Sequence, residues 1–501
     1  MTMHRSVARS LAVVAVIGAA GALTAAPAVA GATASATARP ATQVKWGECP
    51  KEIVTEAGPN KLDCATVPVP LDYNDPDGTR IDIKISRLAS QNPVKRRGIL
   101  MLNPGGPGGS GLSQPAFLMT RGLPASVKDS YDVIGMDTRG IGHSAPVSCG
   151  FTANGPYAAN IPPYAVDDAA VVKRAKVAKQ AAEQCAQKDR DGRLRHVSTA
   201  NMARDLDRIR AALGEKKTSF LGYSYGTALG AAYASMFPER SDRIVLDSNI
   251  GDTHLDPAGM RRYGLGMEQT FPDFAKWAAK RHGTYGLGRT PEEVRATYFK
   301  LAERLDRKPL PDIDGATFRA AMFALLYREA QYITAAQMWQ TLLTGTWPKP
   351  TPVPPGPSPM DNAYTVFLAV TCNDIQWPRD VNTYRRAVEQ DRERYPMYGA
   401  AAANITPCAF WPYKPAEAPV KITDEGPANV LLVQNQRDIP TPHRGGEMLR
   451  EKFGDRARLV SVDASGHGVY LLGENACASN TTTSYLVDGK MPARDVTCPA
   501  S

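Results

Sequence analysis

The sequence predicts an α/β protein: a mostly parallel sheet flanked by helices, with an inserted, mainly helical cap domain. Short apolar runs alternate with amphipathic helical patterns over residues 41–251 and again over 421–501, as in parallel sheets covered by helices. Between them, residues 252–420 are mostly helical in pattern and rich in Trp, Tyr and Met. We therefore expect two core segments interrupted by a helical cap or lid.

The N-terminal segment has the pattern of a secretory signal peptide. A basic stretch, MTMHRSVARS, precedes the apolar run LAVVAVIGAAGALTAA, and Ala28–Ala30 offers small residues for cleavage. The run is rich in Ala and Gly and falls short of the ~20 strongly apolar residues that a membrane span requires. We predict a signal peptide over 1–30, a leader or short pro-segment over 31–40, and a secreted protein without a membrane anchor.

The charge distribution argues against a polyanionic partner. The net charge is +9, of which Arg5 and Arg9 in the signal segment supply two. The other basic residues are scattered, and Val94–Arg97 is the only tight run, whereas nucleic-acid surfaces are usually a basic patch or stripe. We expect no nucleic-acid partner and a monomer.

The cysteines predict disulfides. Their number is even, 8, and none forms a C-x-x-C pair, so structural zinc is disfavoured and oxidised pairs suit an exported chain. Connectivity is not determined by the sequence. Pairing of neighbours closes the most local loops, which predicts Cys49–Cys64, Cys149–Cys185, Cys372–Cys408 and Cys477–Cys498.

The elements of the first core segment follow in order. Apolar runs predict strands over 81–88, 98–103 and 131–137. Residues 198–214 predict a helix with one apolar face, capped by Ser198 or Thr199 and ended by Gly214. A strand over 219–224, a helix over 225–237 and a strand over 243–248 complete this segment.

The pattern after residue 252 differs. The cap is interrupted by a proline-rich connector, Trp347–Pro359, and strands are expected again over 429–438 and from 457 onward, before the loop SGHG.

The stretch GYSYG, Gly222–Gly226, predicts a nucleophile. It is a G-x-S-x-G pattern between a predicted strand and a predicted helix. On such a turn the serine is strained and exposed, small glycines allow the backbone to approach, and the helix N-terminus favours developing negative charge. Ser224 is therefore the candidate nucleophile.

The base and the acid are expected at the ends of later strands. His467 follows a strand in a Gly-flanked loop, whereas His443 lies just beyond the candidate acid and His143 fits loop packing. Asp438 ends the preceding strand and would hold the imidazole tautomer. Asp463, four residues before the histidine, is a rival candidate that we interpret as structural.

The order Ser, acid, His along the chain is that of α/β-hydrolases. We therefore expect the α/β-hydrolase fold.

The glycine-rich loop LNPGGPGGSG, Leu102–Gly111, contains a literal G-x-G-x-x-G. Two prolines remove backbone donors that a dinucleotide loop needs, so the dinucleotide interpretation is disfavoured. The loop fits an oxyanion hole instead, in which a backbone N–H points at a substrate carbonyl. Gly106 is the first choice and Gly105 the second, with the N–H of Tyr225 as the other donor. We expect no cofactor and no metal.

Several motifs together resemble one family. LNPGGPGGSG, YDVIGMDTRGIGHS, RDLDRIRAALG, GYSYGT, DIPTP and SGHG, with CATVPVPLDY early and SYLVDGKMP late, are similar to the secreted tripeptidyl aminopeptidases of actinomycetes. These are α/β-hydrolases of the prolyl-iminopeptidase-like serine peptidase group. The resemblance spans nearly the whole mature chain and implies Ser224, Asp438 and His467 as the triad. LDSNIGD, residues 246–252, and VQNQRD, residues 433–438, depart from the family pattern.

The expected function is a serine peptidase that forms an acyl-enzyme. The large cap favours chain ends as substrates, and the resemblance implies release of tripeptides from free N-termini. A free ammonium is best recognised by a carboxylate in a partly closed pocket, and Glu268 and Asp374 are the candidates. The alternatives are an esterase, lipase or other small-molecule acyl hydrolase of the same fold, and a non-catalytic binding protein on this scaffold.

Overall fold

The structure is a computed structural model that describes residues 44–348 and 354–500. The predicted signal peptide (1–30) and leader (31–40) lie outside the described residues, as does part of the proline-rich connector. In the described ranges, no helix combines the length and the apolar character needed to cross a membrane.

Ten strands of the described residues form one sheet in the order β1-β2-β3-β5-β4-β6-β7-β8-β9-β10. Pairing is antiparallel from β1 to β5 along this order and parallel from β5 to β10. The bounds are β1 (Gly47–Glu48), β2 (Asp63–Pro70), β3 (Arg80–Leu88), β4 (Gly98–Asn103), β5 (Tyr131–Met136), β6 (Thr218–Tyr223), β7 (Ser241–Asp247), β8 (Val430–Arg437), β9 (Ala457–Ser465) and β10 (Val496–Cys498).

The sheet is covered on both faces, so its central strands are buried throughout. Every residue of β4 and β6 is buried, as expected for parallel strands under helices. Alternate residues face opposite sides: Leu100 packs in one apolar cluster and Met101 in the other.

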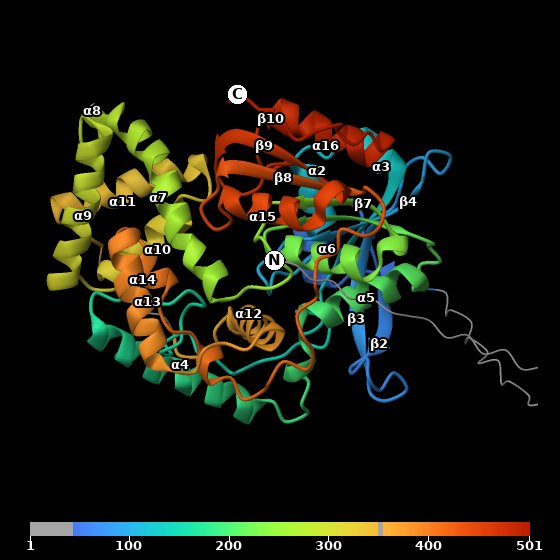
Figure 1. The fold of residues 1–501 in the computed structure, drawn as a ribbon, viewed down its shortest axis with the longest axis horizontal. Helices are drawn as coiled ribbons and strands as arrows, with labels where there is room; N and C mark the ends of the chain where they lie inside the picture. Colours follow the sequence, from blue (N-terminus) through green and yellow to red (C-terminus); the bar gives the residue numbers. More distant parts are fainter. Residues whose placement is uncertain (1–43, 349–353, 501) are drawn as a thin grey trace, which may run out of the picture. The chain divides into compact units, whose positions relative to one another are not determined.

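Helices pack apolar residues into the cluster on each face of the sheet (Figure 1). On one face these helices include α2 (Gln114–Thr120), α3 (Ala125–Ser130) and α16 (Ala476–Asp488), and on the other α5 (Thr199–Ala212), α6 (Tyr225–Met236) and α15 (His443–Phe453), where the cluster extends into helices of the region between β7 and β8. Short elements complete this part: α1 (Lys51–Ala57), η1 (Leu194–His196), η2 (Pro238–Arg240) and η5 (Gly454–Arg456).

The predicted first strands and helices are confirmed. The helix expected over 198–214 is α5, and its N-cap is Ser198, whose side chain accepts a hydrogen bond from the N–H of Asn201.

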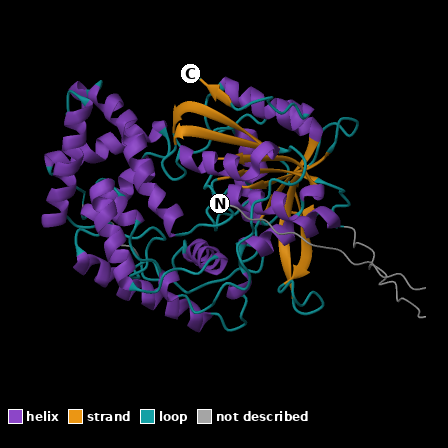
Figure 2. Ribbon diagram, in the orientation of Figure 1, coloured by secondary structure: helices purple, strands orange, loops and turns teal. Residues whose placement is uncertain are grey.

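The described residues between β7 and β8 form helices and the loops that connect them, as Figure 2 shows. Trp339 is fully buried there, and its ring lies 5.4 to 6.2 Å from the rings of Phe271, Phe274, Tyr298 and Phe318. The helices are α7 (Pro257–Ala279), α8 (His282–Tyr285), α9 (Pro291–Arg307), α10 (Gly315–Leu325), η3 (Glu329–Gln331), α11 (Tyr332–Thr344), α12 (Asp361–Asp374), α13 (Val381–Arg394), α14 (Gly399–Ala402) and η4 (Pro407–Phe410).

One helix of the first core segment packs with this helical region. α4 (Asp168–Lys188) follows β5 in the chain, yet its Val171 and Ala175 share an apolar cluster with Tyr384 and Val388 of α13. The helical region therefore draws on two separate stretches of sequence, which the division at residue 252 does not describe.

All four predicted disulfides are present, so the prediction of neighbour pairing is confirmed. The pairs are Cys49–Cys64, Cys149–Cys185, Cys372–Cys408 and Cys477–Cys498. The third joins α12 to η4 within the helical region, and the fourth joins α16 to the edge strand β10.

Candidate active site

Ser224 lies on a strained turn between β6 and α6. Its backbone angles are φ 57° and ψ −124°, a conformation that costs an L-residue free energy and is found at functional turns. Its N–H donates to the carbonyl oxygen of Asp247 on β7 at 3.0 Å. A Cβ on Gly222 would stand 2.4 Å from the oxygen of Gly226, so only glycine allows this turn to close.

His467 and Asp438 are joined, as the sequence predicts. The His467 Nδ1 lies 3.0 Å from Asp438 Oδ1 and 3.1 Å from Oδ2. The carboxylate of Asp438 is fully buried, and the side chain of His467 is 17% exposed. Because Nδ1 faces the carboxylate, Nε2 is left to face a reacting group, as in a general base oriented by an acid.

Ser224 and His467 are not hydrogen-bonded to each other among the described residues. Neither the Ser224 Oγ nor the His467 Nε2 has a hydrogen-bond partner there. Such contacts are often long without substrate and tighten when it binds. Ser224 Oγ and His467 Nε2, which would exchange a proton, therefore have no competing partner among the described residues.

Two further residues hold the histidine, and sequence reasoning missed both. Thr441 Oγ1 lies 3.2 Å from His467 Nδ1, and the Thr441 N–H donates to Asp438 Oδ1 at 3.1 Å. The D-x-x-T spacing, typical of a side chain that bonds to the turn after it, could have indicated Thr441. Tyr327 accepts a hydrogen bond from the His467 N–H at 2.8 Å through its carbonyl, and its ring stands edge-on at 5.2 Å.

The rival histidine and acid have other partners. His443 Nε2 lies 2.7 Å from Ser461 Oγ, and its Nδ1 lies 3.3 Å from Glu447. Asp463 pairs with Arg437 at 2.7 Å. His143 pairs with Glu52 at 3.0 Å, consistent with loop packing.

The glycine-rich loop lies against the nucleophile turn. A Cβ on Gly105 would stand 2.5 Å from the carbonyl oxygen of Tyr223 and 2.9 Å from the Cβ of Ser224. The N–H of Gly105 already donates to Asn103 Oδ1 at 3.0 Å. By contrast, the N–H of Gly106 meets no acceptor in the part of the chain that the structure describes. Tyr225 is the first residue of α6, where backbone N–H groups have no partner within the helix.

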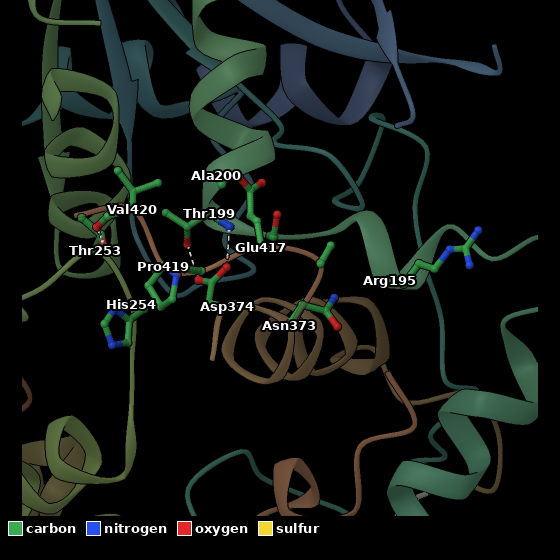
Figure 3. A pocket seen from close by; sticks show the side chains of 13 residues that line it. Arg195, Thr199, Ala200, Thr253, His254, Asn373, Asp374, Glu417, Pro419 and Val420 are labelled. Carbon is green, nitrogen blue, oxygen red and sulfur yellow. Dashed lines mark hydrogen bonds between the residues drawn. The ribbon is translucent and has the colours of Figure 1, made fainter. Parts of the chain in front are cut away.

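The two carboxylates predicted to bind an amine have partners within the chain. Glu268 accepts from Arg295 at 2.8 Å and from the N–H of Met397 at 3.0 Å. Asp374 accepts from both the N–H and the hydroxyl of Thr199, as Figure 3 shows. Burial raises the pKa of Asp374 to about 7, although the hydrogen bonds from Thr199 oppose this and nearby Glu417 adds to it.

Asp374 thereby caps the start of α5 from a distant part of the chain. The geometry does not bring Asp374 or Glu268 into contact with Ser224 or His467. Over residues 44–348 and 354–500, no cluster of His, Cys, Asp and Glu has the arrangement of a metal site.

The chain is similar to known proteins over most of its length. Residues 395–498 match the family described as TAP-like protein. The chain is 35% identical over 456 residues to a tripeptidyl aminopeptidase of Streptomyces lividans, covering 88% of this chain and 84% of that one.

Two further relatives come from Mycobacterium tuberculosis. Serine protease Hip1 is 28% identical over 491 residues, covering 91% of each chain. A carboxylesterase B is 29% identical over 480 residues, covering 91% of this chain and 90% of that one.

Among solved structures, a serine hydrolase of Cycloclasticus zankles covers 85% of this chain and 98% of its own, with 15% identity and a TM-score of 0.35. With the parallel sheet, the serine turn and the relative at 35% identity together, the chain belongs to the tripeptidyl aminopeptidase family of α/β-hydrolases and is a serine hydrolase of the peptidase type.

Proposed function

We propose that this chain is a secreted serine exopeptidase that releases tripeptides from the free N-terminus of peptides. The observation that carries the proposal is the pairing of His467 Nδ1 with the buried Asp438 at 3.0 Å, in a chain whose Ser224 sits on the strained turn. The tripeptide length is supported by the Streptomyces lividans relative, which is named a tripeptidyl aminopeptidase.

The chemistry runs through an acyl-enzyme. Ser224 Oγ attacks the scissile carbonyl while His467 Nε2 takes its proton and then gives it to the leaving amine. Asp438 holds the imidazole and stabilises the imidazolium. Water, activated by the same histidine, then releases the peptide acid and restores Ser224.

The N–H groups of Gly106 and Tyr225 are the proposed oxyanion donors. Both lack a hydrogen-bond partner among the described residues, and both flank the Ser224 turn. Donors fixed in advance where negative charge develops stabilise the transition state without further reorganisation. Gly105 is the weaker choice because its N–H is engaged by Asn103.

Export is supported by the disulfides. Four pairs among the described residues suit an oxidising compartment. The predicted signal peptide at residues 1–30 adds to this.

The preference for chain ends is supported by contacts between the helical region and the catalytic loops. Tyr327 bonds the backbone of His467, and a Cβ on Gly266 of α7 would stand 1.9 Å from the carbonyl oxygen of Ile439. Helices that press this closely on the loops of Asp438 and His467 restrict the approach of folded proteins more than that of peptide ends.

Recognition of the terminal amine by Glu268 or Asp374 stays a prediction. Each carboxylate would have to exchange or share the partners it has in this structure. Glu268 is the better placed of the two to do so, because its carboxylate is partly exposed whereas Asp374 is buried.

Labelling with a fluorophosphonate tests the serine hydrolase assignment. We expect a single adduct on the peptide that contains Ser224, and none in Ser224→Ala. Ser461→Ala is the matched control, because Ser461 also contacts a histidine, His443, but lies within β9 away from the turn. Absence of any adduct on folded protein would favour a non-catalytic binding protein, and an adduct that persists in Ser224→Ala would refute the assigned nucleophile.

The second candidate function is hydrolysis of small esters. It is favoured by the relative named carboxylesterase B, which aligns over 91% of this chain. The triad is the same for both functions, so only the preferred substrate distinguishes a peptidase from an esterase. We expect higher kcat/KM on free-amine peptides than on p-nitrophenyl acyl esters; the reverse order would favour the esterase.

A further inference from the structure

Asp247 ends β7 as a fully buried carboxylate beside the catalytic loops. Its Oδ1 accepts from the N–H of Val469 at 3.0 Å, and its Oδ2 accepts from the N–H of Tyr470 at 2.7 Å. These two residues follow His467 closely in the chain. The carbonyl oxygen of Asp247 accepts the N–H of Ser224 at 3.0 Å. One residue thus bonds the loops of both proposed proton-exchange partners.

Ser248 extends this contact. It has φ +63°, a region that favours glycine, and it is fully buried. Its hydroxyl donates to Asp247 Oδ1 at 3.0 Å and accepts from the N–H of Gly468 at 2.9 Å. Asp247 and Ser248 together therefore accept the three successive N–H groups that follow His467. The hydroxyl gives a serine a role at a position where glycine would relieve strain.

Among the described residues, hydrogen bonds and not an ion pair hold the carboxylate of Asp247. Among the residues described, no Lys, Arg or His lies within ion-pair distance of its carboxylate. The pKa of Asp247 is raised to about 7, mainly by burial and in small part by Asp438 nearby, while the N–H groups of Tyr470 and Val469 and the Ser248 hydroxyl act in the opposite direction. Burying a carboxylate without a cation costs free energy, which indicates that Asp247 has a structural or catalytic role.

Asp247 is not the triad acid. Its oxygens meet backbone N–H groups, whereas the imidazole of His467 faces Asp438. On the other side of the loop, the N–H of His467 donates to Tyr327. The histidine is therefore held from the strand end on one side and from the helical region on the other.

We propose that Asp247 and Ser248 are positioning residues that fix His467 relative to Ser224. This rests on the proposed roles of Ser224 and His467 as nucleophile and base. The residue that anchors the serine turn through its carbonyl also anchors the histidine loop through its carboxylate, so the end of β7 sets the separation of the two reacting groups. Neither side chain touches the substrate in this proposal.

The test compares Asp247→Asn, Ser248→Ala and Ser248→Gly with the wild-type chain. The asparagine variant replaces one acceptor with a donor that faces a backbone N–H. A displacement of about 1 Å between reacting groups costs about 10²-fold in rate. We therefore expect kcat and the rate of fluorophosphonate labelling per folded molecule to fall by about that factor, with KM little changed. For Ser248→Ala we expect about a fivefold fall, the equivalent of one neutral hydrogen bond.

Ser248→Gly separates the hydroxyl from backbone strain. It removes the same hydroxyl as Ser248→Ala but relieves the positive φ, so both variants should lose labelling rate to a similar extent while the glycine variant is the more stable. Asp242→Asn is the matched control: Asp242 lies at the amino end of the same strand and pairs with Arg97 at 3.0 Å. We expect its labelling rate to equal that of wild type.

A purely structural role would lower the thermal midpoint while leaving the labelling rate per folded molecule unchanged, and that result would overturn the proposal. If Asp247→Asn does not fold, the two Ser248 variants decide by the same criterion. Failure of the proposed function is a separate outcome, because it would appear as labelling that survives Ser224→Ala.

Discussion

Polar groups at the carboxyl edge of the sheet and in the helical region between β7 and β8 differ in whether they have hydrogen-bond or ion-pair partners. At the sheet edge, the Ser224 hydroxyl, the outer nitrogen of His467 and the N–H of Gly106 have no partners among the described residues. In the helical region, carboxylates pair with arginines of that region: Glu268 with Arg295, and Asp306 with Arg319.

The groups that can react with a substrate and the groups that stabilise the fold therefore lie in different regions of the protein. Groups without internal partners are available to a substrate, and they gather where the strands β4, β6 and β9 end. Groups with internal partners stabilise a fold that limits access. We propose that the core carries out the chemistry and that the helical region selects chain ends.

Asp438→Asn should have the largest effect on rate. An asparagine in place of a triad acid holds the wrong imidazole tautomer, which costs about 10⁴-fold in kcat. The measurement is kcat on a free-amine peptide and on an ester, and both should fall equally, because the core serves every substrate. The control is Asp463→Asn, which alters a surface partner of Arg437. Loss on peptides alone would contradict the division.

Removal of the disulfide Cys372–Cys408 by paired serines should destabilise the helical region. Disulfides of this kind contribute about 3 kcal/mol to the free energy of unfolding, measured here by urea denaturation. We also expect a higher KM for peptides, while fluorophosphonate labelling of Ser224 in the folded protein stays near wild type. A matching loss of labelling would show that the helical region also supports the chemistry.

The stability of the protein should decline between about pH 4 and pH 7 because of Asp374. Its pKa is about 7 in the fold, where burial favours the neutral acid, against 3.8 for an ordinary aspartate. The stabilisation is complete below the lower value and is lost as pH rises through the higher one. Asp374→Asn should remove about 3 kcal/mol of the decline between pH 5 and pH 8. Equal pH dependence in both proteins would disprove this account of Asp374.

Glu268→Gln should have the smallest effect. If its carboxylate exchanges Arg295 for a substrate ammonium, KM for free-amine peptides should rise about tenfold, a charge-assisted hydrogen bond being worth roughly that much. Turnover of simple esters should be unchanged. Arg295→Met is the matched control, since it removes the ion pair and leaves the carboxylate. An equal loss on peptides and esters would assign Glu268 to stability only.

Much of the core could be predicted from the sequence because its signals are local. The strand before GYSYG, the turn itself and the helix after it are contiguous, Asp438 comes immediately after β8, and His467 lies two residues after the end of β9. The positions of these residues follow from the rule that parallel strands end at one edge.

The rest depends on contacts between distant residues. Asp247 meets Tyr470, 223 positions further along, and no local pattern indicates which backbone groups a buried acid will bind. In the same way, Asp374 caps α5 at Thr199, 175 positions earlier in the chain, and no local pattern indicates that contact. α4 packs with α13 across more than two hundred residues, so the extent of the helical region could not be read from periodicity.

The central claim is that the core cleaves and the helical region admits only peptide N-termini. Mass spectrometry of the products from one peptide with a free amine and from its N-acetylated twin tests it most directly. The account predicts successive losses of three residues from the free peptide and no cleavage of the acetylated one. Internal cuts, single-residue losses or equal cleavage of both peptides would contradict it.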